Sequence, residues 1–159
     1  MIEDGPWTGG ASPTAMEALH LRLAAPFEDA VAFVQLEHEL AGFETISLTR
    51  VDRLVAEVLD DEVVPLAMLV VCHAELARDA LEIDPRVAAL LPCTTVVYDP
   101  PDDDYVHVHH LSATKAIRDL RVAPSDRGAA VERLVEATGE RMAAVWATLE
   151  ASDAAVDDP

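Results

Sequence analysis

The feature that most limits the fold of this chain is a nearly uninterrupted apolar segment at residues 63–72, which reads VVPLAMLVVC. A membrane-spanning helix needs about 20 apolar residues, so this segment is too short to cross a bilayer. An apolar run of this length is typical of a strand that is covered on both faces inside a sheet. We therefore expect a central strand here, with Pro65 tolerated near its beginning.

The segments around this strand show the patterns of further strands and amphipathic helices. Residues 19–24 alternate apolar and polar side chains, as a half-buried strand does. Residues 26–42 follow with a helical stripe that opens at Pro26 and closes at Gly42. The same criteria predict strands at residues 43–48, 94–98 and 105–111, and helices at residues 51–58, 73–83, 112–120 and 125–151.

The two ends of the chain differ in composition from the part between them. Residues 1–18 are rich in Gly, Pro, Ser, Thr and Ala, with Trp7 as a large anchor, and we expect a flexible N-terminal arm. Residues 152–159 have the composition of a loose acidic tail. The intervening residues 19–151 are long enough for one domain with a single core.

The charge balance excludes some classes of partner. The chain has 30 Asp and Glu against 11 Lys and Arg, with a formal net charge of -19. Nucleic acids and anionic membranes bind clustered positive charge, so we expect neither as a partner. The acidity, with Lys115 as the sole lysine, fits halophilic adaptation to a saline cytoplasm; the alternative is a surface that recognises a basic partner.

The first ten residues, MIEDGPWTGG, contain neither the basic region nor the apolar region of a secretory signal. We therefore expect a cytoplasmic protein. In that compartment Cys72 and Cys93, the only two cysteines, are expected to be reduced.

Several short motifs occur in an order that resembles the domain of unknown function 302 family (DUF302-like). They are Gly42-Phe43, Val71-Cys72, Leu76-Ala77, Ala80-Leu81, Asp84-Pro85, Leu90-Leu91-Pro92-Cys93 and Val97-Tyr98, within residues 19–120. The resemblance implies an α+β domain similar to the TATA-binding-protein arrangement, with a mainly antiparallel sheet of about five strands, helices packed on one side and a long C-terminal helix. It implies no established activity.

The resemblance also implies that the protein is often a homodimer, and the apolar stripe of the C-terminal helix favours the same expectation, because it exceeds what one small sheet needs. The chain departs from the family where Cys-Asn-Pro is usual and Cys72-His73-Ala74 occurs instead. The chain therefore lacks the Asn-Pro turn of the family's first cysteine motif, and with it any ligand contact that this turn makes.

The antiparallel sheet implied by the resemblance would place Cys72 and Cys93 at one edge and bring their thiols close together. Cys72 would also precede a helix, whose N-terminus lowers the pKa of a thiol. These conditions suit thiol, persulfide or soft-metal chemistry. The alternative is that both cysteines pack in the core as small apolar side chains.

A second candidate lies in the strand at residues 105–111. His107 and His109 share one face of that strand, roughly 6 to 7 Å apart, a spacing that can chelate zinc, nickel or copper. Such a site would have to borrow ligands, for which Cys93, His73 or an aspartate of residues 102–104 are candidates. The alternative is that Val106 and Val108 face the core while the two histidines face solvent or a partner subunit. His110 has the parity of the valines and is not simply a third ligand.

The sequence contains no nucleophile elbow, glycine-rich phosphate loop or zinc-protease motif, and we predict no cofactor. Three hypotheses remain. The first, which we favour, is binding or sensing of a small molecule or sulfur species near Cys72, His73 and Cys93. The second is an enzyme with Cys72 as nucleophile, which would need a base such as His73 beside it. The third is a dimeric interaction module without a small ligand.

The halophilic interpretation predicts how stability depends on salt. The melting temperature should rise substantially between low-salt buffer and molar potassium chloride, because screening weakens the repulsion among the carboxylates. Thermal unfolding followed by circular dichroism measures this change. A melting temperature that does not respond to salt would contradict the interpretation.

Overall fold

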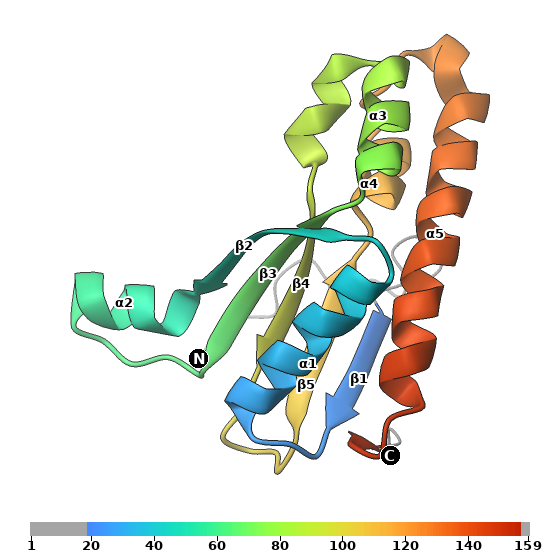
Figure 1. Cartoon of the computed structure of the whole chain (residues 1–159). Helices are drawn as coiled ribbons and strands as arrows, with labels where there is room; N and C mark the ends of the chain where they lie inside the picture. Colours follow the sequence, from blue (N-terminus) through green and yellow to red (C-terminus); the bar gives the residue numbers. More distant parts are fainter. Residues whose placement is uncertain (1–18, 157–159) are drawn as a thin grey trace, which may run out of the picture.

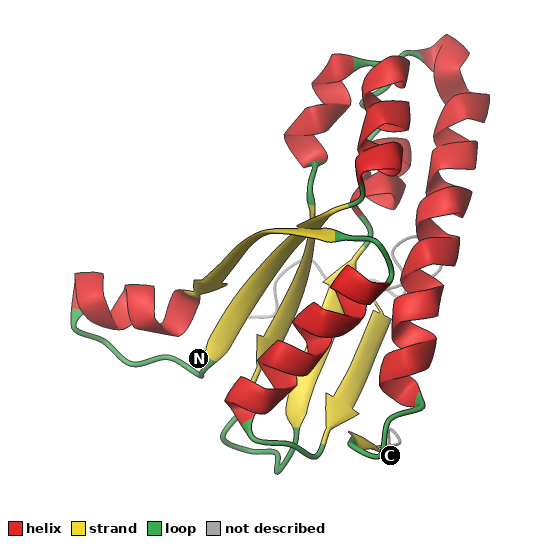
Figure 2. Cartoon of the chain, in the orientation of Figure 1, coloured by secondary structure: helices red, strands yellow, loops and turns green. Residues whose placement is uncertain are grey.

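The computed structural model describes residues 19–156 and contains a six-stranded sheet in which every neighbouring pair is antiparallel (Figure 2). The strand order is β2-β3-β4-β5-β1-β6. The bounds are β1 (Leu19–Leu23), β2 (Glu44–Arg50), β3 (Leu66–Cys72), β4 (Cys93–Tyr98), β5 (Val106–Leu111) and β6 (Ala155–Val156). The α+β class expected from the sequence is confirmed.

Within residues 19–156, five α-helices and two short 3-10 helices accompany the sheet. The bounds are α1 (Phe27–Leu40), α2 (Val51–Leu59), α3 (Ala74–Ile83), η1 (Pro85–Leu90), α4 (Ala113–Asp119), η2 (Ser125–Arg127) and α5 (Gly128–Glu150). Helices α1 and α5 lie over one face of the sheet, α3 and α4 stand beyond one end of the strands, and α2 projects from the edge (Figure 1). No helix within residues 19–156 is long and apolar enough to cross a membrane.

The ends of the chain are only partly described. The N-terminal arm expected at residues 1–18 lies outside the described residues. Strand β6 lies within the stretch expected to be an acidic tail, and its two residues pair with Arg22 and Leu23 of β1. Residues 157–159 again lie outside the described part.

The sheet is buried on one face only. In β3 the side chains of Ala67, Leu69 and Val71 are buried, whereas the alternate residues from Leu66 to Cys72 are partly exposed. Strands β4 and β5 alternate in the same way. The expectation that the strand at residues 63–72 is covered on both faces is therefore wrong, because α1 and α5 cover the same side. We call the other side the open face.

Helix α5 belongs to two apolar clusters at once. Its C-terminal half packs with α1 on the sheet, and its N-terminal half packs against α3, η1 and α4. The residues of α5 that are buried in this way are Val131, Leu134, Val135, Thr138, Met142, Val145, Trp146 and Leu149. The apolar stripe of α5 is buried by other segments of its own chain. The argument that this stripe exceeds what one small sheet needs, which favoured a homodimer, is therefore wrong.

A chain of polar side chains crosses the core beneath α1. His38 Nδ1 donates to the carbonyl of Val34 at 2.7 Å, so its Nε2 is an acceptor. Thr95 Oγ1 lies 3.1 Å from His38 Nε2 and 2.9 Å from His110 Nδ1. Thr95 therefore donates to His38 and accepts from His110. All three side chains are buried, and the chain of bonds assigns one neutral tautomer to each histidine.

This buried set of hydrogen bonds makes the free energy of unfolding depend on pH. Burial, and then the nearby His38, lower the pKa of His110 to about 4, and burial also lowers the pKa of His38. The unfolded chain therefore binds protons at a higher pH than the folded chain does. The stabilisation is full above about pH 6.5 and is lost as the pH falls toward 4. For His110 alone the loss is on the order of 3 kcal/mol.

Urea denaturation between pH 7 and pH 4 measures this effect. The variant His110→Gln keeps a neutral polar side chain that does not titrate, so its stability should fall less over the same range. The difference between the two proteins isolates the histidine from the many carboxylates, which are common to both. Parallel pH profiles for the two proteins would contradict the assignment.

Candidate functional site

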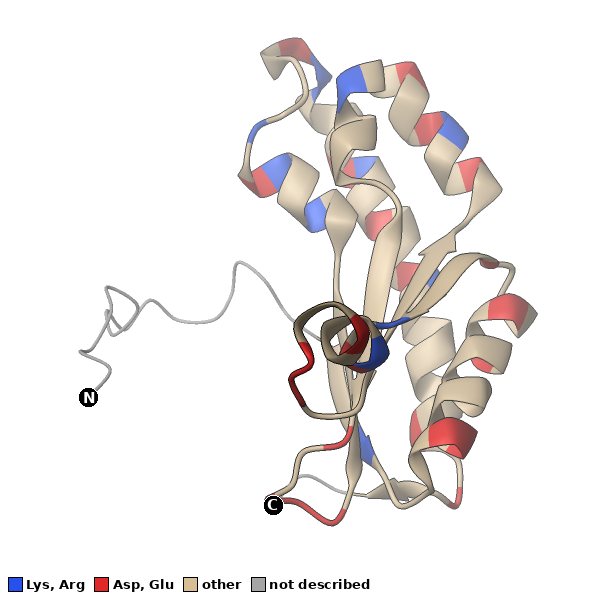
Figure 3. Ribbon diagram, turned by 90° about the vertical axis from the view of Figure 1, so that its left-hand side faces the viewer, with Lys and Arg blue, Asp and Glu red and all other residues tan. Residues whose placement is uncertain are grey.

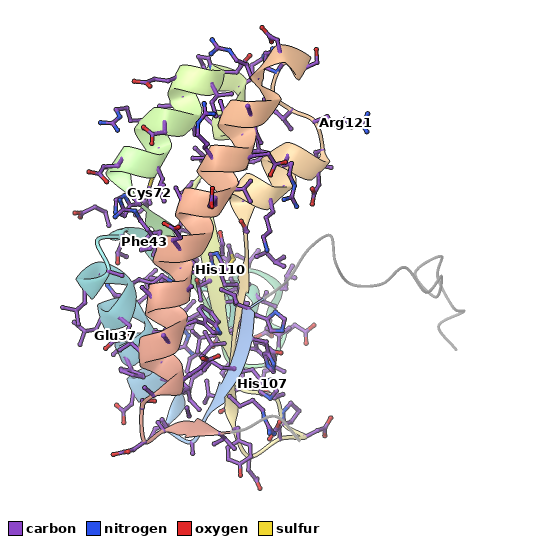
Figure 4. The ribbon with its side chains drawn as sticks, turned by 90° about the vertical axis from the view of Figure 1, so that its right-hand side faces the viewer. Glu37, Phe43, Cys72, His107, His110 and Arg121 are labelled. Atoms are coloured by element: carbon purple, nitrogen blue, oxygen red, sulfur yellow. The ribbon has the colours of Figure 1, made fainter. Side chains whose placement is uncertain are left out.

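The structure brings Cys72 and Cys93 to the same end of the sheet. Val71 pairs with Cys93 across β3 and β4, so Cys72 lies one residue beyond that pair. Both cysteines are free, with Cys72 partly exposed and Cys93 buried. They line one cavity of about 20 Å³ together with Phe43, His73, Leu76, Thr114 and Thr138, among others. Figure 4 shows Cys72 beside Phe43 at this end of the molecule.

The electrostatics of the two thiols differ from the expectation. Helix α3 does begin at Ala74, directly after Cys72 and His73. Burial nevertheless raises the pKa of the Cys72 thiol. Burial also raises the pKa of Cys93, against a hydrogen bond from the backbone of Ala113 that lowers it. The expectation of a lowered pKa at Cys72 is wrong, because burial raises it, and both thiols stay protonated at neutral pH.

His73 is the polar side chain that joins this cavity to α5. The residue is 9% exposed, and its ring packs edge-to-face on Phe43, with ring centroids 5.5 Å apart. The guanidinium of Arg141 donates to His73 Nε2 at 2.9 Å and also pairs with Glu75 at 2.7 Å. Nε2 is therefore the unprotonated nitrogen. Nδ1 then carries the hydrogen, and it is buried without a hydrogen-bond partner among the described residues.

Gly42 makes room for this histidine. It has a φ of +89° in the turn between α1 and β2, a conformation that favours glycine. A Cβ at this position would lie 3.2 Å from His73 Nε2. The glycine of the Gly42-Phe43 motif thus allows both the turn and the close approach of the imidazole.

The second sequence candidate lies elsewhere in the molecule. His107 and His109 are on the open face of β5, and His107 pairs with Tyr98 of β4. Tyr98 is five residues after Cys93, or about 16 Å along the strand. The structure therefore does not bring Cys93 or His73 to these histidines. Of the proposed additional ligands only Asp103 lies there, with its carboxylate 2.8 Å from His107 Nε2.

The sequence interpretation missed His20, whose ring lies beside those of His107 and His109. Strand β1 pairs with β5, and His20 stands opposite His109. His20 Nε2 is 2.9 Å from His107 Nδ1. The alternation in β1 places His20 on the polar face, but only the strand order puts β1 beside β5. Among the described residues no three His, Cys, Asp or Glu side chains already stand in position to hold a metal ion.

A larger depression lies on the open face between these two ends. It is a groove of about 450 Å³ lined mainly by β4, the end of β5 and the start of α4, and both Pro92 and His109 border it. Its walls are mostly apolar. The cavity at the cysteines is much smaller, so the two places differ in the size of ligand that they can accept.

The comparisons with known proteins agree with the fold. A solved structure, that of an uncharacterized conserved DUF302 protein from Bacillus stearothermophilus, shares 18% sequence identity with this chain. The match covers 80% of this chain and 94% of that one, with a TM-score of 0.69. No curated protein matches. The family described as "Domain of unknown function DUF302" matches residues 19–149, and the chain belongs to this family.

Proposed function

We propose that this domain binds a small sulfur species, for which hydrosulfide is the simplest probe, in the cavity between Cys72 and Cys93. The observation that carries the proposal is the buried Nδ1–H of His73, which has no partner in the described chain and belongs to a residue that lines this cavity. A buried donor without a partner costs about 1 to 3 kcal/mol. An acceptor in the cavity would remove that cost.

The size of the cavity limits the ligand. A volume of about 20 Å³ exceeds the roughly 10 to 15 Å³ that one water molecule requires and is far below a drug-sized pocket. A triatomic or diatomic species such as hydrosulfide has the appropriate size. An organic thiol would require the walls to move.

The groups around the cavity favour an acceptor with a negative charge. Both thiols are neutral, because burial raises their pKa, so they can offer weak S–H donors and do not repel an anion. The guanidinium of Arg141 lies directly behind His73. Soft, polarisable sulfur atoms on the wall also make good contacts with a sulfur ligand.

The same electrostatics disfavour the enzyme hypothesis. A nucleophilic cysteine needs a lowered pKa or an adjacent base that accepts its proton. The pKa of Cys72 is raised, and the acceptor nitrogen of His73 is occupied by Arg141. We therefore infer binding or sensing in a reducing cytoplasm rather than catalysis by Cys72.

Titration calorimetry with sodium sulfide in anaerobic buffer tests the proposal. We expect one site per chain, and we expect sulfide to change the nitrogen chemical shift of His73 Nδ1, the donor that lacks a partner among the described residues. The variant His73→Phe removes the N–H donor and keeps a ring, so it should bind at least tenfold more weakly. His109→Phe makes the same change on the open face and should bind as the native protein does. Absence of both heat and a shift of His73 Nδ1 at millimolar sulfide would overturn the proposal.

We also propose that the protein is a homodimer, joined through the arm formed by β2 and α2. No residue of α2 is buried, and β2 is the edge strand of the sheet. The exposed large apolar side chains of this arm and its return loop are Ile46, Leu48, Leu54, Val58, Leu59, Val63 and Val64. An antiparallel edge can pair with a second copy of itself about a twofold axis, which would also cover both α2 helices.

Light scattering after size exclusion in high salt measures the oligomeric state. Val58→Asp on α2 should convert the dimer into a monomer, because it places a charge in the apolar interface. Leu120→Asp is a matched control, since Leu120 is 66% exposed and Val58 is 69% exposed. A monomer for the native protein at micromolar concentration, or equal effects of the two variants, would contradict this dimer.

A further inference from the structure

Three histidines gather on the open face, at the opposite end of the strands from the cysteines. Strand β1 contributes His20, and β5 contributes His107 and His109. The ring centroid of His20 lies 5.1 Å from that of His107 and 4.6 Å from that of His109. All three side chains are partly exposed, so the cluster is accessible from solvent. The position of His107 near the lower end of the sheet is visible in Figure 4.

Two nitrogens of this cluster converge on one point. His20 Nε2 and His107 Nδ1 are 2.9 Å apart. Metal–imidazole bonds of about 2.0 to 2.1 Å in tetrahedral geometry put two ligand nitrogens about 3.3 Å apart. These two nitrogens share a hydrogen bond, and their separation differs from that of a metal-bound pair by only a few tenths of an ångström. An ion would replace the shared hydrogen, and both rings would tilt so that their lone pairs point at the ion beside the N–N line.

A carboxylate already orients His107 for this role. The other nitrogen of the ring, Nε2, donates to Asp103 Oδ2 at 2.8 Å. This bond assigns the hydrogen to Nε2 and leaves the lone pair on Nδ1, which is the nitrogen directed at His20. Histidine ligands of metals typically donate their second N–H to a carboxylate in this way, and the carboxylate also strengthens the ligand.

The surroundings of His107 also hold its ring in place. Tyr98 stacks on it, with ring centroids 5.1 Å apart and an interplanar angle of 29°. Arg22 lies 3.6 Å from the same carboxylate of Asp103, so this carboxylate is held between Arg22 and His107. This geometry lets the carboxylate support a metal-bound imidazole.

The geometry points to a divalent transition-metal site, of the zinc or nickel class, built from His20 and His107 with His109 as the third ligand. His109 stands directly opposite His20 in the ladder, and rotation about its side-chain torsions brings its ring toward the same point. This rotation is required, because no three ligands among the described residues are already in place. Water completes the coordination. Asp103 is a positioning residue that acts through His107.

Titration of the untagged, metal-free full-length chain with zinc sulfate tests this site by calorimetry. We expect one zinc per chain and a higher melting temperature in its presence. His107→Ala should weaken binding at least 100-fold, and Asp103→Asn about 10- to 100-fold, since loss of a carboxylate that hydrogen-bonds a metal ligand has that effect. Asp102→Asn is the matched control: it removes the same charge from the neighbouring position, which is exposed, and should leave the affinity unchanged.

Two further measurements identify the ligands directly. The nitrogen chemical shifts of His20 Nε2 and His107 Nδ1 should change on addition of zinc, while those of the buried His38 should not. A cobalt complex should lack thiolate-to-metal charge-transfer bands, because neither cysteine lies at this site. Four outcomes would overturn the inference: no binding at millimolar zinc, equal effects of Asp103→Asn and Asp102→Asn, a thiolate band, or one zinc per two chains. Circular dichroism of each metal-free variant confirms that it is folded before it is compared.

Discussion

The packing of α5 across two apolar clusters is the interaction on which the rest of the structure depends. One half of this helix closes the core between the sheet and α1, and the other half holds α3, η1 and α4 beyond the ends of the strands. Between the halves, Arg141 reaches His73 and Glu75 of the neighbouring α3 region. The cavity at the cysteines lies at this junction, so its shape depends on how α5 is seated.

Covering a sheet on one face only gives the two candidate sites different environments. Cys72, Cys93 and His73 lie where strands meet helices, and burial keeps their neutral forms. His20, His107 and His109 lie on the open face, where they are partly exposed to solvent and where Asp103 contacts His107. A small cavity with neutral walls suits a small ligand bound by weak donors, whereas a half-exposed imidazole cluster suits a metal ion that keeps some of its water.

The acidic side chains lie mainly outside the strands that carry the two candidate sites. They are carried mainly by helices and loops, while the strands are largely free of them (Figure 3). Arginines pair with them locally, as in Arg86 with Asp84 and Arg50 with Asp52. The excess negative charge is therefore a property of the outer surface, and neither candidate site is built from a cluster of carboxylates.

The sequence by itself determined the elements and their class. The alternation in β1 and β5, the apolar run of β3 and the stripe of α5 each reflect local periodicity, and all were found close to their observed bounds. The motifs around Gly42, Cys72 and Cys93 identified the family. Periodicity along one segment reports which side chains share a face, and for that information no partner is needed.

Only the tertiary structure decided what each face meets. The apolar composition of residues 63–72 did not show that helices cover only one face of the sheet. The apolar stripe of α5 did not show that α3 and α4 would bury part of it. Strand order put His20 beside His107, since β1 and β5 are distant in sequence and adjacent in the sheet. The pKa of Cys72 likewise followed from burial by distant segments rather than from its position before α3. These properties depend on long-range contacts, which the local pattern of a single segment does not contain.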